Sequence, residues 1–197
     1  VKYILDKIKD KNPSCNNGFT PLDVATKEGH FKVFEHMAGF VSNLNFTKLL
    51  HLAASEGHIE IVKYITRIVS DKNPYNDASE HVGEATPLHT AALHYAARNG
   101  HIETVKCILE FIDDANLKDN EGTTPMHRAA QQGHYEICKI LINHGADSNP
   151  INDEGTSAID LAGINAPGTS QEIRDLILRN QKKIQLQTFK KKNLMVL

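Results

Sequence analysis

The chain has 197 residues, of which 40% are hydrophobic and 23% are charged, a composition typical of an ordinary protein with one sizeable domain or several small stacked units. Its formal net charge of −2 is unevenly distributed: residues 180–197 contain five lysines and no acid, so the preceding body carries −7, which argues against a body that binds nucleic acid. The chain has three cysteines, which argues against a disulfide framework. It has no apolar run of ~20 residues, which argues against a membrane-spanning helix.

The first stretch of the chain, VKYILDKIKDK, has the pattern of a helix already under way and opens without a methionine. We therefore expect the N-terminus to be a fragment boundary. We also expect residues 1–15 to be the second helix of a truncated repeat.

A Gly-His dipeptide then recurs along the chain, at residues 29–30, 57–58, 100–101 and 133–134. Each copy opens an amphipathic stretch such as GHYEICKILI and follows a helix rich in small residues such as TPMHRAAQQ. In the last copy Thr124 can cap the first helix, Pro125 can occupy its first turn and Gly133 can end it. One such helix pair cannot bury its own apolar face, so the pattern predicts a stack of several pairs.

The segment TPMHRAAQQGH at residues 124–134 is similar to the T-P-L-H-x-A-A-x-x-G-H signature of the ankyrin repeat family. LINHGADSN at residues 141–149 resembles the end of that repeat and its loop. The resemblance extends to about residue 180 and implies an all-α ankyrin-repeat solenoid of helix-turn-helix units with connecting hairpin-like loops. We expect about five repeats over residues 16–180, the last of them a divergent C-terminal cap that includes GTSAIDLAG and QEIRDLILRN.

The spacing of the repeats is uneven in the middle of the chain. His58 follows His30 by 28 residues and His101 follows His58 by 43, whereas the usual period of 33 separates His101 from His134. The short interval predicts a very short connecting loop. The excess in the long interval is shared between the polar stretch SDKNPYNDASEHVG, which predicts a long loop finger, and a duplicated phrase, LHTAA followed by LHYAA at residues 88–97.

The duplicated phrase contains nothing that would end a helix. We therefore expect one long first helix from about Pro87 to Arg98, about 7 Å longer than its neighbours. Five residues rotate a helix by a net angle of about 140°, so Leu88 should not share a face with Leu93 and the extra turn should project beyond the stack. A looped-out first copy and an artefact in the sequence are the alternatives.

The eleven histidines suggest a metal site, but their positions argue against it. Two positions of the repeat hold most of them. The T-P-L-H position holds His51, His89, His94 and His127, and the Gly-His position holds His30, His58, His101 and His134. The resemblance implies a structural role at both positions, with the rings hydrogen-bonded to the Thr hydroxyl or to backbone. The sequence contains no H-E-x-x-H, no paired Cys-x-x-Cys, no nucleotide-binding glycine motif and no G-x-S-x-G. We therefore expect no metal, no cofactor and no catalytic residue, and we expect Cys107 and Cys138 to be buried small hydrophobes.

The resemblance implies a non-enzymatic protein-protein interaction module that presents a concave groove and loop fingers to a protein partner, whose identity the sequence does not give. The candidate groove residues are Lys27, Glu28, Ser55, Glu56, Tyr95, Arg98, Asn99, Arg128, Gln131 and Gln132. The candidate finger residues are Asn76, Asp77, Glu80, His81, Asp119 and Asn120. For any single one of these positions the alternative is a solvated face that binds nothing.

A second hypothesis is a structural spacer within a longer ankyrin array or within the cytoplasmic region of a channel. We expect no nucleic acid on the repeat body, no membrane insertion and a monomer in the cytoplasm, with the nucleus as an alternative location. Residues 181–197 are expected to be a basic tail, and a solvated, disordered terminus is favoured for it. A nuclear import signal, a contact with an anionic surface and folding of its apolar end onto the last repeat are the alternatives.

Overall fold

The computed structural model describes residues 12–41, 44–71 and 87–194, and their regular structure is helical apart from one antiparallel bridge between Ile151 and Ser157. The expectation of an all-α chain of paired helices is confirmed. The chain divides into two compact units, Val1–Asp113 and Asp114–Leu197, called here the N-terminal and the C-terminal unit and described separately.

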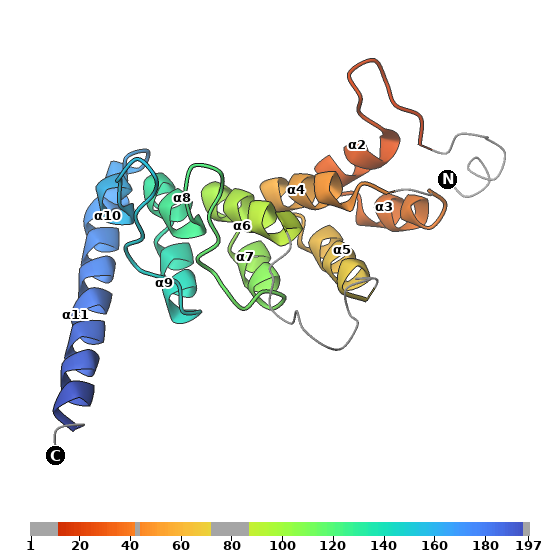
Figure 1. Cartoon of the computed structure of the whole chain (residues 1–197). Coiled ribbons are helices and arrows are strands. Elements are labelled where there is room, and N and C mark those ends of the chain that lie inside the picture. Colours follow the sequence, from red (N-terminus) through yellow and green to blue (C-terminus); the bar gives the residue numbers. More distant parts are fainter. Residues whose placement is uncertain (1–11, 42–43, 72–86, 195–197) are drawn as a thin grey trace. The chain divides into compact units, whose positions relative to one another are not determined.

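The N-terminal unit contains three helix pairs, α2 (Pro21–Lys27) with α3 (Phe31–Ala38), α4 (Phe46–Glu56) with α5 (Ile59–Asp71), and α6 (Pro87–Asn99) with α7 (Ile102–Leu109). The first helices pack side by side in the order α2, α4, α6, and the second helices in the order α3, α5, α7 (Figure 1). The core lies between these two layers, where side chains such as Phe34, Leu50, Ile61 and Leu93 are fully buried. The layers exist because no single pair can cover its own apolar face.

The first helix of the unit is tied to the next one through Asp23, which occupies the slot that holds a histidine in most other repeats. The Thr20 N–H donates to the Asp23 carboxylate over 2.9 Å, and Lys48 of α4 donates to the same carboxylate over 2.6 Å. Burial alone would raise the pKa of Asp23, but the hydrogen bonds from Lys48 and Thr20 outweigh it and lower the pKa. The carboxylate therefore caps α2 and joins it to α4 at once.

The Gly-His histidines connect each pair to the one before it. The His58 Nε2–H donates to the Lys27 carbonyl over 2.7 Å, and the His101 Nε2–H donates to the Ser55 carbonyl over the same distance. A side chain at Gly57 would meet the His101 ring, since a Cβ there would lie 2.5 Å from Nδ1. The dipeptide recurs because the glycine of one repeat makes room for the imidazole of the next. The structural interpretation of these two histidines is confirmed.

The duplicated phrase forms one continuous helix. Helix α6 has 13 residues, against 8 in α8 of the next repeat and 11 in α4 of the preceding one. The expected long first helix is therefore confirmed, but the expected excess of about 7 Å holds only against α8, and α6 is about 3 Å longer than α4. The expectation that its extra turn projects beyond the stack is wrong at His89, whose side chain is only 5% exposed. The Phe111 ring, in the segment after α7, stacks on the His89 ring with centroids 6.4 Å apart and covers it.

The C-terminal unit contains α8 (Pro125–Gln132) with α9 (Tyr135–Asn143), then α10 (Ala158–Leu161), the 3₁₀ turn η1 (Pro167–Thr169) and the long helix α11 (Ser170–Leu194). Helix α8 packs on α9 and α10, while α11 packs on α9 and α10 through Ile173 and Ile177, both fully buried. Two hairpin loops precede α8 and α10. The Asp119 N–H donates to Thr123 O in the first, and the Asn152 N–H donates to Thr156 O in the second.

The two ends of the repeat region differ from expectation. Residues 1–11 lie outside the described part of the chain, and residues 12–15 are not helical. Pro13 disfavours helix at the residue before it, and Asn12 instead accepts a hydrogen bond from the Leu22 N–H at the start of α2. At the other end, α11 does not stop at residue 180 but continues to Leu194, because no Gly or Pro follows Gly168. Residues 181–194 are therefore helical, not a disordered tail.

Candidate interaction surface

The first helices of the N-terminal unit expose the same repeat position, the residue directly after the slot of Asp23, His51 and His94. This position holds Val24 in α2, Leu52 in α4 and Tyr95 in α6. Val24 is 49% exposed, Tyr95 is 42% exposed and Leu52 is half-buried. Because α4 packs against both α2 and α6, the three side chains form a row across the first-helix layer, called here the apolar row.

The Tyr95 side chain is held in place by the neighbouring helix. Its ring lies 5.8 Å from the His51 ring of α4, centroid to centroid, with the two planes tilted by 49°. An aromatic side chain fixed in this way loses little rotational freedom when a partner covers it. The expected groove residue Tyr95 is thus exposed on a preformed surface.

The other candidate groove residues of this unit fall into two groups. Ser55 and Asn99 bond to one another: the Asn99 amide donates to the Ser55 carbonyl over 2.7 Å and to its hydroxyl over 3.1 Å. They act as a cross-link between α4 and α6, beside the His101 hydrogen bond to the same carbonyl. The second group consists of exposed charged side chains at the C-terminal ends of the first helices, namely Lys27, Glu28, Glu56 and Arg98.

In the C-terminal unit the structure joins a candidate groove residue to a candidate finger residue. The Arg128 guanidinium donates to the Asp119 carboxylate over 2.8 Å and lies 3.5 Å from the Glu121 carboxylate. Burial would raise the pKa of Asp119, but hydrogen bonds from Arg128 and from the Glu121 and Thr123 N–H groups outweigh it and lower the pKa. Arg128 therefore anchors the hairpin to α8. Asn120, at the hairpin tip, is exposed, whereas Gln131 and Gln132 are half-buried.

The remaining finger candidates, Asn76, Asp77, Glu80 and His81, lie outside the described residues.

Sequence reasoning missed Val24 and Leu52. The signal that could have found them is their register, since both stand six residues before a Gly-His histidine, as Tyr95 does. They were overlooked because an apolar residue in a helix is more often buried than exposed.

The chemistry of the described residues is that of a packed scaffold. Within residues 12–41, 44–71 and 87–194 no three His, Cys, Asp or Glu side chains gather where they could hold a metal ion. Burial raises the pKa of the Cys138 thiol to about 12, and burial beside Glu110 raises that of Cys107. Among the helices described, none has the length and apolar character needed to cross a bilayer.

His127 is the most enclosed polar side chain of the C-terminal unit. Its Nδ1 accepts from the Thr124 N–H over 3.1 Å and lies 3.0 Å from the Thr124 hydroxyl, and its Nε2–H donates to the Thr156 carbonyl over 3.2 Å. Burial lowers its pKa, and the nearby Arg128 lowers it further, against the opposing effects of the Thr156 carbonyl and Asp119. Burial also lowers the pKa of His89. In the folded chain both rings therefore favour the neutral form at neutral pH.

We expect the chain to lose stability on mild acidification. The folded-state pKa values of His89 and His127 lie below the unfolded value of about 6.5, so the unfolded chain binds more protons in this range. Their contribution is fully present above about pH 6.5 and is lost as the pH falls through the lowered folded-state values. Urea unfolding followed by circular dichroism should give a free energy of unfolding about 1 kcal/mol smaller at pH 5.5 than at pH 7.5. The slope should be shallower in His127→Gln, and equal stability at both pH values would contradict neutral burial of these rings.

Comparison with known proteins agrees with the helix pairs and their connections. A family model described as ankyrin repeats (3 copies) matches residues 93–188, and a model described as ankyrin repeat matches residues 49–74. A comparison with curated proteins finds no match. Ankyrin repeats are in general protein-protein interaction modules and are typically non-catalytic. The repeated capping pattern, the stacked helix pairs and these two matches together show that the chain belongs to the ankyrin repeat family.

Proposed function

We propose that the chain binds a protein partner through the apolar row of Val24, Leu52 and Tyr95. The observation that carries this proposal is that three aligned repeat positions expose apolar side chains on neighbouring helices. Contiguous apolar surface rimmed by polar residues is typical of interaction sites, because covering it removes apolar area from water. Lys27, Glu28, Glu56 and Arg98 supply the polar rim and the charges that would discriminate between partners.

The spacing of the row favours an extended partner segment. Packed helices lie roughly 8–10 Å apart. In the extended polyproline II conformation three residues span about 9 Å and complete one turn, so every third side chain lies on the same side. A polyproline II segment with an apolar side chain at every third position could therefore place one on each of α2, α4 and α6. In the C-terminal unit the Arg128–Asp119 pair holds the hairpin in position and leaves Asn120 at its tip for a second contact.

The proposed setting is a reducing compartment, the cytoplasm with the nucleus as the alternative, and the proposed state is a monomer. Cys15, Cys107 and Cys138 are all free thiols, as suits such a compartment. A spacer in a longer array remains the second candidate, and the experiment below separates the two.

The test is affinity capture from a cell lysate with the intact chain and with the triple variant Val24→Ser, Leu52→Ser, Tyr95→Ala. We expect a partner that the intact chain retains to be lost from the variant, because three apolar contacts worth about 1 kcal/mol or more each are removed. Isothermal titration with a peptide from the captured partner would then measure the loss of affinity, which should exceed about a hundredfold.

The matched control is Ile102→Ser, which removes an exposed apolar side chain from the same unit but from a second helix, α7. This variant should capture the partner as the intact chain does. Equal capture by the triple variant would move the site to the hairpin tips or to α11. If neither the intact chain nor any variant captured a partner, the spacer function would be favoured.

A further inference from the structure

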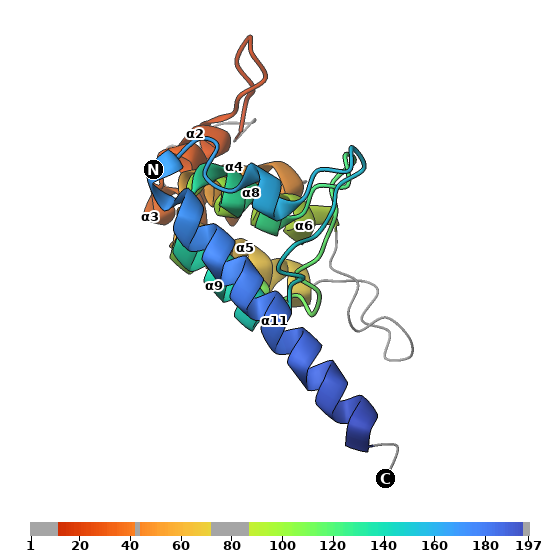
Figure 2. The same cartoon turned by 90° about the vertical axis from the view of Figure 1, so that its left-hand side faces the viewer.

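Helix α11 extends far beyond the surface on which it packs. Its first turns are anchored by Ile173 and Ile177, but every residue from Lys182 to Lys192 is exposed. Figures 1 and 2 both show α11 continuing past the end of α9 within the C-terminal unit. The repeat fold needs only the anchored part, so the overhang of α11 requires another explanation.

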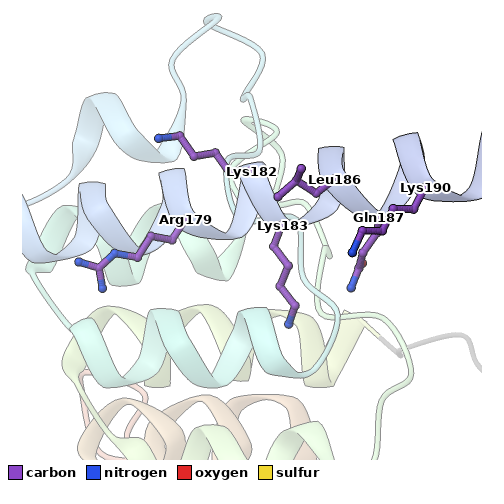
Figure 3. A pocket seen from close by; sticks show the side chains of 6 residues that line it. All are labelled: Arg179, Lys182, Lys183, Leu186, Gln187 and Lys190. Atoms are coloured by element: carbon purple, nitrogen blue, oxygen red, sulfur yellow. The ribbon is translucent and has the colours of Figure 1, made fainter.

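The overhang is strongly cationic. After Asp175 there is no acid in the helix, while the side chains of Arg179, Lys182, Lys183, Lys190, Lys191 and Lys192 are all positive. Figure 3 shows four of these cations along one stretch of α11, with Arg179 and Lys183 leaving the helix on the same side. Cations in the last turn interact favourably with the helix dipole, which accounts for Lys190–Lys192 but not for the exposed apolar residues that precede them.

From Leu178 onwards α11 exposes large apolar side chains, and all of those described except Ile184 lie on one side of the helix. Leu178, Leu186 and Phe189 are 44%, 61% and 65% exposed. A helix rotates by about 100° per residue, so Leu186 and Phe189 both lie within about 80° of Leu178 around the helix axis. Lys182 lies within the same sector. Arg179, Lys183 and Lys190 follow within about a further 60°. Apolar and cationic side chains therefore lie next to each other along one side of the helix, called here the mixed side.

We propose that the mixed side of α11 binds the surface of a bilayer containing anionic lipids. A helix lying in the interface places apolar side chains at the boundary of the acyl chains while its lysines pair with anionic headgroups. Nucleic acid phosphates would satisfy the lysines but would leave Leu186 and Phe189 in water. An acidic protein would have to supply a groove for both. A lipid surface takes up the two kinds of side chain together, and the contact is peripheral because α11 is too polar to span a bilayer.

The test is flotation of the full chain with vesicles of phosphatidylserine and phosphatidylcholine in equal parts, compared with phosphatidylcholine alone. We expect binding only to the anionic vesicles, weakened by added salt. The variant Lys182→Gln, Lys183→Gln, Lys190→Gln should bind on the order of a hundredfold more weakly, since each lysine near the surface contributes about a fivefold gain. The variant Leu186→Ser, Phe189→Ser should bind at least about tenfold more weakly than the intact chain.

The matched control is Ile184→Ser, which removes a side chain that is 51% exposed from a position about 160° around the helix from Leu186. It should bind as the intact chain does, and circular dichroism should show equal helix content in all variants. Failure to bind anionic vesicles would overturn the proposal, as would full binding by Leu186→Ser, Phe189→Ser. Tighter binding to a DNA duplex or to polyglutamate than to the vesicles would also overturn it and would assign the overhang to nucleic acid or to an acidic protein.

Discussion

Replacing Gly133 by alanine is expected to lower the free energy of unfolding of the C-terminal unit by about 3 kcal/mol. Gly133 ends α8 with φ +78°, a left-handed conformation that costs a residue with a side chain roughly 1–2 kcal/mol. In addition, a Cβ there would lie 2.5 Å from the Ala166 Cβ and would also strike the Thr169 hydroxyl. Because η1 is packed against this glycine, relieving the contact would require η1 to move away. Urea unfolding followed by circular dichroism measures the loss.

Gly155→Ala provides a matched control. Gly155 has the same φ of +78°, but nothing lies within 4 Å of the position a Cβ would take. Only the backbone cost should remain, so this variant should lose about 1 kcal/mol. The difference between the two variants isolates the packing of η1 on the end of α8. Equal losses would mean that η1 does not rest on Gly133 in solution.

Replacing His127 by alanine is the second change with a large expected effect, again about 3 kcal/mol. The side chain is fully buried, and both of its ring nitrogens are engaged. Its removal leaves the Thr124 N–H without its partner, takes from the Thr156 carbonyl one of two hydrogen bonds, and opens a cavity between α8 and the following hairpin. An unpaired buried backbone group costs about 1–3 kcal/mol, so this loss and the cavity add to a substantial fraction of the stability of a small unit. Chemical denaturation of the intact chain and of the variant, both at pH 7.5, measures this cost under conditions in which His127 is neutral.

Asp160 occupies the same slot in the next repeat and serves as the comparison. It also completes a capping box, since the Ser157 N–H donates to its carboxylate over 3.0 Å, but its side chain is exposed. Asp160→Ala should therefore be clearly less destabilising than His127→Ala, because water can replace the lost hydrogen bonds. A loss in Asp160→Ala as large as in His127→Ala would show that burial is not what makes the His127 slot important.

Much of the fold could be predicted because its signals are local. The T-P-L-H slot, the capping Thr and the Gly-His dipeptide each act within one helix or one turn, so the helix pairs could be placed from the sequence. The long helix α6 was predicted for the same reason, since the duplicated phrase has no residue that would stop it. The length of α11 was missed although its signal was also local: without Gly or Pro the helix propagates through the lysines.

The candidate surface was predicted only in part. Tyr95 was identified because an aromatic residue in a variable position attracts notice, whereas Val24 and Leu52 resemble core residues until the helices are placed side by side. Arg128 and Asp119 were assigned separately to a groove and a finger, although they form one ion pair. Such pairings depend on how a loop folds back on a helix, and spacing along the chain does not encode that geometry directly.

The sequence by itself determined the repeat, the ends of the helices and the all-α class, because caps, turns and helical periodicity are set by neighbours a few residues apart. Only the tertiary structure decided which side chains remain exposed. It placed the Phe111 ring over His89, aligned Val24, Leu52 and Tyr95 across three helices, and carried the mixed side of α11 beyond the packed repeats. Exposure depends on contacts between elements distant in the chain, and the physical reason is that apolar surface is buried wherever another element can reach it.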